Sequence, residues 1–111
     1  MRVFVIMSKI CPHGPSLVEV ASRAKGSGKA SRLWVDQAKQ LVPEARFIAH
    51  YALLGPYDFM DIYEAPDEQT AVKVAMIGSA SGAFQVETWS AIPDAKLAEL
   101  ARAVRKPGEP A

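Results

Sequence analysis

The sequence predicts a mixed α+β fold in which four antiparallel strands form one sheet and helices cover one of its faces. Three observations predict this fold. Strand-like and helix-like segments alternate in the order β-α-β-β-α-β, and a turn signal at Gly55-Pro56 joins the middle two strands as a hairpin. The chain of 111 residues also has room for one modest hydrophobic core, which suits a single domain.

The first half of the chain predicts one strand and one interrupted helical region. Residues 2–8 form an apolar, β-branched run of strand length, and a proline-rich loop follows it. Ser16 and Glu19 have the spacing of a capping box, so a helix is expected to start there. The Gly-Ser-Gly segment at 26–28 predicts an interruption of that helix, after which helical apolar spacing resumes over residues 30–41.

The second half predicts the hairpin, a second helix, a last strand and a terminal helix. Pro66 with Asp67 marks the start of the second helix, and Gly78 with Gly82 marks its end. Apolar residues at helical spacing after Pro93 predict the terminal helix. The expected strands of this half are residues 45–54, 59–64 and 83–92.

This order of elements is the ferredoxin-like βαββαβ pattern, an antiparallel sheet with helices on one face, extended here by a C-terminal helix. We expect one domain over residues 1–105. A flexible tail is expected over residues 106–111, which contain two prolines.

Composition excludes several classes of function. The formal net charge of +1 gives the chain no strongly basic or acidic character, so we expect no nucleic-acid or membrane partner. The lone Cys11 allows no disulfide within the chain, and no secretory or membrane-spanning segment is evident, so a cytoplasmic protein is expected. The cysteine and histidines do not have the spacing of a metal site, so we expect no metal. The sequence also has no nucleotide-binding motif, so we expect no cofactor. A local basic run is expected to be solvated helix surface or a subunit contact: Arg23, Lys25, Lys29 and Arg32.

The hairpin turn has the sequence Gly55-Pro56-Tyr57-Asp58, and Glu64-Ala65-Pro66-Asp67 follows at the second helix, with Gly82 and Thr88 further on. This combination resembles the signature of the GYD-domain family over most of the chain, from Met1 to about Ile92. The resemblance implies a ferredoxin-like fold of the kind that pairs as a dimeric α/β barrel, and it implies no established reaction.

The resemblance carries over five signature residues and no catalytic ones. They are Gly55, Tyr57, Asp58, Pro66 and Asp67. A structural role is favoured for them, since Asp58 can accept backbone donors around the turn and Asp67 suits the positive end of a helix. Two positions depart from the family pattern. Asp61 stands where a small or apolar residue is usual, and Ser90 stands where an arginine is usual.

The hairpin register predicts which side chains share a face of the sheet. A two- or four-residue loop would place Leu54 opposite Phe59 and His50 opposite Tyr63. We expect the face that carries His50, Asp61 and Tyr63 to point away from the helices. A three-residue loop with a bulge would reverse this assignment. The opposite face is expected to pack under the helices with an almost wholly apolar set: Phe47, Ala49, Tyr51, Leu53, Met60 and Ile62.

Two helices cover only one face of a four-stranded sheet, so the second apolar face predicts a protein partner. A second copy of the chain is the simplest one, as a homodimer or higher homo-oligomer.

His50, Asp61 and Tyr63 form the best titratable cluster that the sequence offers. A carboxylate beside an imidazole can orient it for proton abstraction or for anchoring a small polar ligand. The alternative is a polar patch that fixes the register between subunits. The loop with Cys11 and His13 is a weaker candidate, and we expect it at the opposite end of the sheet from the Gly55–Asp58 turn.

Three functions therefore remain open at this point. The first is a homo-oligomeric protein that binds a small molecule. The second is a cofactor-independent oxygenase, isomerase or decarboxylase of the dimeric α/β-barrel type that uses His50 with Asp61. The third is a purely structural self-assembly module.

Overall fold

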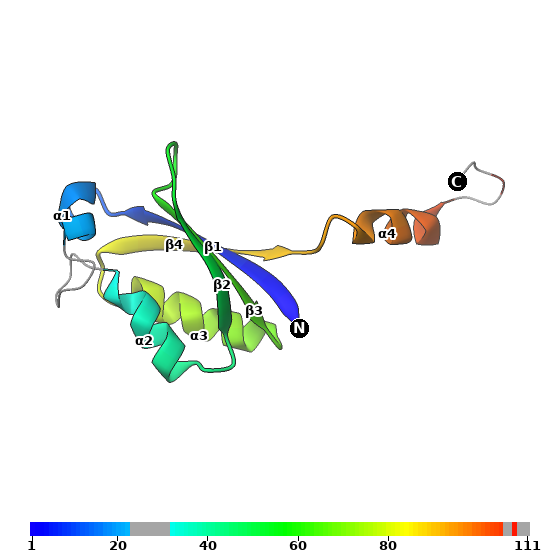
Figure 1. Cartoon of the computed structure of the whole chain (residues 1–111), viewed down its shortest axis with the longest axis horizontal. Coiled ribbons are helices and arrows are strands. Elements are labelled where there is room, and N and C mark those ends of the chain that lie inside the picture. The colour runs from blue at the N-terminus through cyan, green and yellow to red at the C-terminus, as the bar shows by residue number, and fades with distance from the viewer. Residues whose placement is uncertain (23–31, 106–107, 109–111) are drawn as a thin grey trace.

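The computed structural model describes residues 1–22, 32–105 and 108, and it shows a mixed α+β chain with a four-stranded antiparallel sheet. Figure 1 shows the elements in space, with two helices against one face of the sheet and the last helix beyond its end. In chain order they are β1 (Arg2–Ile10), α1 (Leu17–Ser22), α2 (Leu33–Leu41), β2 (Arg46–Ala52), β3 (Phe59–Ala65), α3 (Glu68–Ser79), β4 (Phe84–Ala91) and α4 (Lys96–Val104).

The strand order is β2-β3-β1-β4, and every neighbouring pair is antiparallel. The two hairpin strands are adjacent, and the first strand lies between the third and the fourth, an order compatible with the ferredoxin-like pattern. The core lies between the sheet and helices α2 and α3. Its largest fully buried side chains include Ile6, Val20, Val42, Tyr63 and Val74.

Local signals at the helix starts are confirmed. The Ser16 hydroxyl accepts from the Glu19 backbone N–H at 3.2 Å, and the Glu19 carboxylate accepts from the Ser16 N–H at 3.4 Å, as a capping box requires. Asp67 caps α3 by accepting from the N–H and the hydroxyl of Thr70. These hydrogen bonds favour the carboxylate and lower the pKa of Asp67.

Two expectations fall outside the described part of the chain. The predicted interruption at 26–28 lies in the segment 23–31, and all of the predicted tail except Gly108 lies in the C-terminal gaps.

The end of α3 differs from the prediction. Gly78 does not stop the helix but is buried within its last turn. A Cβ at this position would lie 3.2 Å from Val86 Cγ1 and 3.4 Å from the Trp34 ring, so the glycine lets the helix approach both β4 and α2. Gly82, with a φ of +76°, supplies the turn into β4.

The predicted faces of the sheet are wrong. Asp61 and Tyr63 lie on the helix-covered face and have no exposed area, whereas Met60 and Ile62 lie on the uncovered face. The central strand explains the reversal: Phe4 and Ile6 pack under the helices, and they pair with Tyr63 and Asp61 across the ladder.

The predicted hairpin register is also wrong, by two residues. His50 lies opposite Asp61 rather than Tyr63, and Ala52 rather than Leu54 lies opposite Phe59. A bulge between Phe47 and Ala49 then turns Phe47 to the helix-covered face, where it packs against the core. Ala49 and Tyr51 stay on the uncovered face, so only Phe47 of the predicted set lies as we expected among the residues placed by this ladder.

The loop after β1 and the hairpin turn lie at the same end of the sheet, not at opposite ends. The antiparallel pairing of Ser8 with Phe59 brings the end of β1 beside the start of β3. The Ile10 N–H accordingly donates to Asp58 Oδ2 at 2.8 Å, and Lys9 Nζ lies 5.5 Å from the centre of the Tyr57 ring.

Among the described residues, no helix is both long enough and apolar enough to cross a membrane.

Replacing Gly78 by valine is expected to lower the free energy of unfolding by about 1–3 kcal/mol, because the added side chain meets Trp34 and Val86 in a packed interface. Chemical denaturation measures the change. Lys73→Val, at an exposed position of the same helix, is the matched control and should cost less. Equal losses in the two variants would contradict the close approach at Gly78.

Candidate functional site

A buried carboxylate organises the most polar part of the helix-covered face. Asp61 comes from the middle of β3 and has no exposed side-chain area. One of its oxygens accepts from His50 of β2, and the other pairs with Arg32, which immediately precedes α2. We call these three residues the Asp61 cluster.

In the Asp61 cluster, His50 and Arg32 each contact one carboxylate oxygen of Asp61. His50 Nδ1 lies 2.7 Å from Asp61 Oδ1, and the Arg32 guanidinium forms an ion pair with Asp61 Oδ2. The guanidinium also lies over the Phe59 ring, 4.2 Å from its centre. The side chain of His50 is 35% exposed and that of Arg32 is 18% exposed, so the cluster opens to solvent on the histidine side.

This arrangement has a definite chemical capacity. A carboxylate beside Nδ1 favours the tautomer that carries its proton there, which leaves Nε2 with a lone pair that can accept a proton or a hydrogen bond. The His50 side chain is partly exposed, so a ligand can reach the ring from solvent. The predicted contact between Asp61 and His50 is therefore confirmed, but Asp61 lies on the helix-covered face and not on the uncovered face where we expected it.

Tyr63 does not join the Asp61 cluster. The Phe47 ring packs against both His50 and Tyr63, with centroids 5.4 Å and 5.2 Å away. The Tyr63 ring also stacks on Phe4 at 5.6 Å. Within the described part of the chain its buried hydroxyl has no hydrogen-bond partner, and burial raises the pKa of Tyr63 to about 12. Tyr63 is thus an aromatic core residue with an unpaired hydroxyl.

Sequence reasoning missed Arg32, which it placed in a solvated basic run. The signal was available: an ionised carboxylate inside an apolar strand needs a cationic partner, since burying it alone costs several kcal/mol. A search for that partner would have considered Arg32, because it stands next to the first apolar residues of α2.

The signature residues of the hairpin turn hold three strands together at one end. Gly55 has a φ of +135°, which suits glycine, and Asp58 binds β1 through the Ser8 carbonyl and the Ile10 N–H. Tyr57 reaches across to β4, where its hydroxyl donates to Glu87 at 2.7 Å. This hydrogen bond raises the pKa of Tyr57 and lowers that of Glu87.

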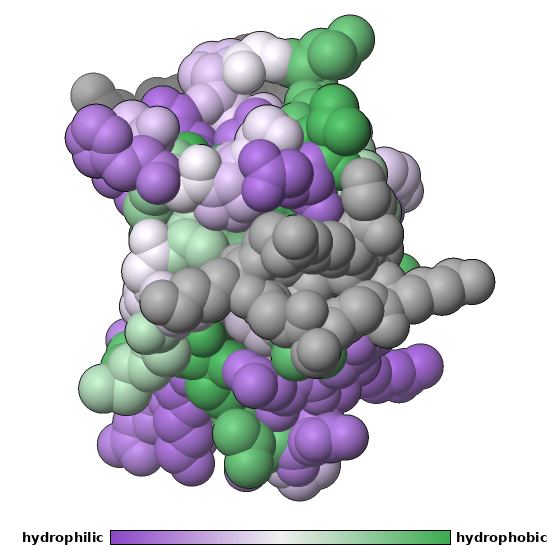
Figure 2. All heavy atoms as spheres, turned by 90° about the vertical axis from the view of Figure 1, so that its left-hand side faces the viewer, coloured by the Kyte–Doolittle hydropathy of each residue, from purple (hydrophilic) through white to green (hydrophobic). Residues whose placement is uncertain are grey.

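Trp89 of β4 contacts both Glu87 and Tyr57. Its indole N–H donates to the second oxygen of Glu87 at 3.2 Å, and its ring meets the Tyr57 ring edge to face. The turn itself remains prominent, since Leu54 is fully exposed. Figure 2 shows apolar side chains at the top of its view, at the level of this turn. The expected structural role of Tyr57 and Asp58 thus agrees with their contacts.

The remaining candidates of the sequence show no comparable constellation. Cys11 is a partly exposed free thiol whose backbone N–H donates to the Ala83 carbonyl. His13 is exposed in the same loop. In the described ranges, no group of three or more histidine, cysteine or acidic side chains is placed to hold a metal ion.

Comparison with known proteins gives one family and one relative. The GYD domain matches residues 17–101. The chain is 32% identical over 98 residues to a protein of Thermus thermophilus named glutamine synthetase and cystathionine beta-lyase binding protein. The alignment covers 87% of this chain and 95% of that relative. No solved structure shows a significant match.

Tyr63→Phe is expected to reduce the loss of folding stability at alkaline pH. The pKa of about 12 in the folded protein exceeds the ordinary value of 10, so the unfolded chain loses this proton first and wild-type stability falls as pH rises from 10 to 12. Two pKa units correspond to about 3 kcal/mol at most.

Urea unfolding of both proteins between pH 7 and pH 11 measures this difference. The phenylalanine variant should be at least as stable as the wild type at pH 7, because no described residue binds the hydroxyl, and it should lose less stability above pH 10. A variant less stable at pH 7 would show that the hydroxyl has a partner.

Proposed function

This chain belongs to the GYD-domain family, and on that premise we propose that it is a homo-oligomeric binding protein whose copies associate through the uncovered face of the sheet. One observation carries the proposal. The face opposite α2 and α3 carries apolar side chains on all four strands, and neither of these helices covers it (Figure 1).

The uncovered face carries the side chains that alternate with the core residues along each strand. Its apolar members are Val3, Val5, Met7, Ala49, Tyr51, Met60, Ile62, Trp89 and Ala91, and Lys9, Glu64, Gln85 and Glu87 lie on the same face. Tyr51 is 53% exposed and Trp89 is 45% exposed, although aromatic side chains of this size are usually largely buried. Apolar faces of this extent on a single chain mark association surfaces.

A second copy is the simplest occupant of such a face. Two sheets packed face to face would bury both uncovered faces at once, and a twofold axis would make the contact self-complementary. The dimeric α/β barrel is the arrangement that meets this requirement, and we propose it for this chain.

The partner of the assembled protein is proposed from the relative. By its name, the Thermus protein binds glutamine synthetase and cystathionine beta-lyase, and the alignment spans nearly the whole of both chains. We propose that this chain likewise acts by binding other proteins. We also propose that the exposed His50 side of the Asp61 cluster binds a small polar ligand.

A second candidate function rests on the same cluster. The short contact between His50 Nδ1 and Asp61 is the arrangement of an oriented general base. By analogy with dimeric α/β barrels, the candidate is a cofactor-independent oxygenase, isomerase or decarboxylase.

The association surface is tested by Ile62→Asp, which places a charge at the centre of the uncovered face. Light scattering at micromolar concentration should give at least twice 12.0 kDa for the wild type and a lower mass for the variant. Leu41→Asp, at an exposed position on α2, is the matched control and should keep the wild-type mass. A monomeric wild type would refute the proposed assembly.

The ligand site is tested by native mass spectrometry of freshly purified protein. We expect bound mass on the wild type that His50→Ala loses while the number of subunits stays the same. His13→Ala removes the other histidine and should retain the ligand. No bound mass on the wild type, or equal retention in both variants, would contradict a site at His50. The enzymatic candidate further requires that the wild type, and not His50→Ala, converts the released compound.

A further inference from the structure

The last helix stands away from the rest of the chain. Figure 1 shows α4 beyond the end of the sheet, at the end of a short connection from β4. The Cα radius of gyration is 17.3 Å, against about 13 Å for a compact domain of this length. Within the described structure no residue of α4 is buried. A nine-residue helix is too short to be stable alone in water, so α4 needs a surface to pack on.

α4 carries one apolar stripe that such a surface would cover. Leu97, Leu100, Ala101 and Val104 have the spacing i, i+3, i+4, i+7, which places them on one side of the helix. Leu97 is 55% exposed, Leu100 is 50% exposed and Val104 is 82% exposed. The opposite side carries charged residues that suit solvent, including Glu99 and Arg102.

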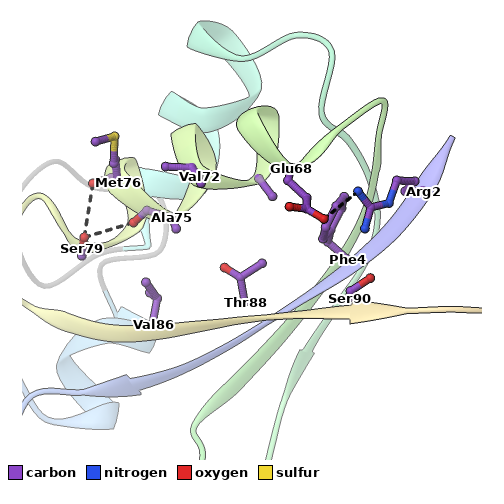
Figure 3. Close-up of a pocket in the computed structure, with 11 residues that line it drawn as sticks. Arg2, Phe4, Glu68, Val72, Ala75, Met76, Ser79, Val86, Thr88 and Ser90 are labelled. Atoms are coloured by element: carbon purple, nitrogen blue, oxygen red, sulfur yellow. Dashed lines mark hydrogen bonds and ion pairs between the residues drawn. The ribbon is translucent and has the colours of Figure 1, made fainter.

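The same chain has an apolar groove with no described occupant. It lies between α3 and β4 on the helix-covered side of the sheet and has a volume of about 550 Å³. Figure 3 shows Val72, Ala75 and Met76 on the helix side, above Val86 and Thr88 of the strand. Val72 is 54% exposed and Met76 is 66% exposed, so the helix wall of the groove is open. The ion pair of Arg2 and Glu68 closes one end.

The stripe and the groove match in length and spacing. Nine helical residues extend about 14 Å, which fits along the α3 wall from Glu68 to Ser79 of about 18 Å. The α3 residues along the groove, Val72, Ala75, Met76 and Ser79, have the same i, i+3, i+4, i+7 spacing as the stripe of α4. Two helices with such ridges can interlock side by side.

The connection between β4 and α4 directs the helix away from its own groove. The C-terminal end of β4 lies at the closed end of the groove, where Ser90 and Arg2 both line it. Docking within one chain would therefore need a sharp reversal immediately after Ala91. Ile92 precedes a proline, which disfavours the helical backbone conformation that tight reversals use.

The residues after Ile92 form a turn that leads into α4. The Lys96 N–H donates to the Pro93 carbonyl, and the Leu97 N–H donates to the Asp94 carbonyl. Four residues, 92–95, therefore separate the strand from the helix, and Figure 1 shows the helix continuing beyond the end of the strand.

We propose that α4 of each copy docks in the α3–β4 groove of a second copy of the chain, so that two copies exchange their C-terminal helices. The exchange extends the proposed homo-oligomer, but it uses a different surface from the uncovered face of the sheet. The two proposals can therefore fail separately.

The exchange is tested with two full-length chains, each carrying a single cysteine on a Cys11→Ser background. One chain has Met76→Cys in the groove, and the other has Leu100→Cys on the stripe and a mass tag. The two are coexpressed, purified together and oxidised, because a disulfide forms only if the two Cα atoms come within about 7 Å. We expect a cross-linked species whose mass is the sum of one chain of each kind. Lys73→Cys, on another side of α3, replaces Met76→Cys as the matched control and should not cross-link to the tagged chain.

A chain with both Met76→Cys and Leu100→Cys distinguishes the occupants. Cross-linked dimers support exchange, whereas an internally cross-linked monomer would show that α4 folds back on its own groove and would overturn the proposal. The absence of any cross-link in either experiment would also overturn it. If the helix exchange fails while Ile62→Asp still dissociates the protein, the sheet-face assembly stands alone.

Discussion

A single buried charge sets the arrangement of three separate segments. Asp61 lies in β3 without exposed area, and an ionised carboxylate in such a place is tolerated only with partners close by. Arg32 supplies one partner from the start of α2, and His50 supplies the other from the edge strand β2. The carboxylate therefore ties a helix and an edge strand to the inside of the sheet. Any repositioning of α2 or slip of the hairpin would leave this charge unpaired.

The sequence predicted the elements well because local signals decide them. Hydrophobic periodicity, the Ser16–Glu19 capping box and the Pro66-Asp67 start are properties of short segments, and each lies where the structure has its element. The predicted pairing of Asp61 with His50 also holds.

The faces of the sheet could not be obtained in this way. The side that a strand turns toward the helices depends on its neighbours in the ladder, and here Phe4 and Ile6 of β1 decide it for β3. Alternation in the hairpin favoured the more apolar set for the helix-covered face, and this choice was wrong because Asp61 is buried there with Arg32 and His50 as partners. The bulge near Phe47 added a further change of face that no turn signal marks. Arg32 was missed for the same reason, because its role appears only once Asp61 is placed inside.

The two edges of the sheet have a consequence for the behaviour of the chain in solution. Exposed edge strands present unpaired backbone groups that can add further strands, which is a common route to fibrous aggregation. Here β2 is irregular at its bulge, and β4 is followed within two residues by Pro93, which cannot donate to a ladder. A strand added to β2 would meet an irregular ladder at the bulge. A strand added to β4 could not extend its pairing past Pro93. These two features limit how far an added strand could pair along either edge of the sheet.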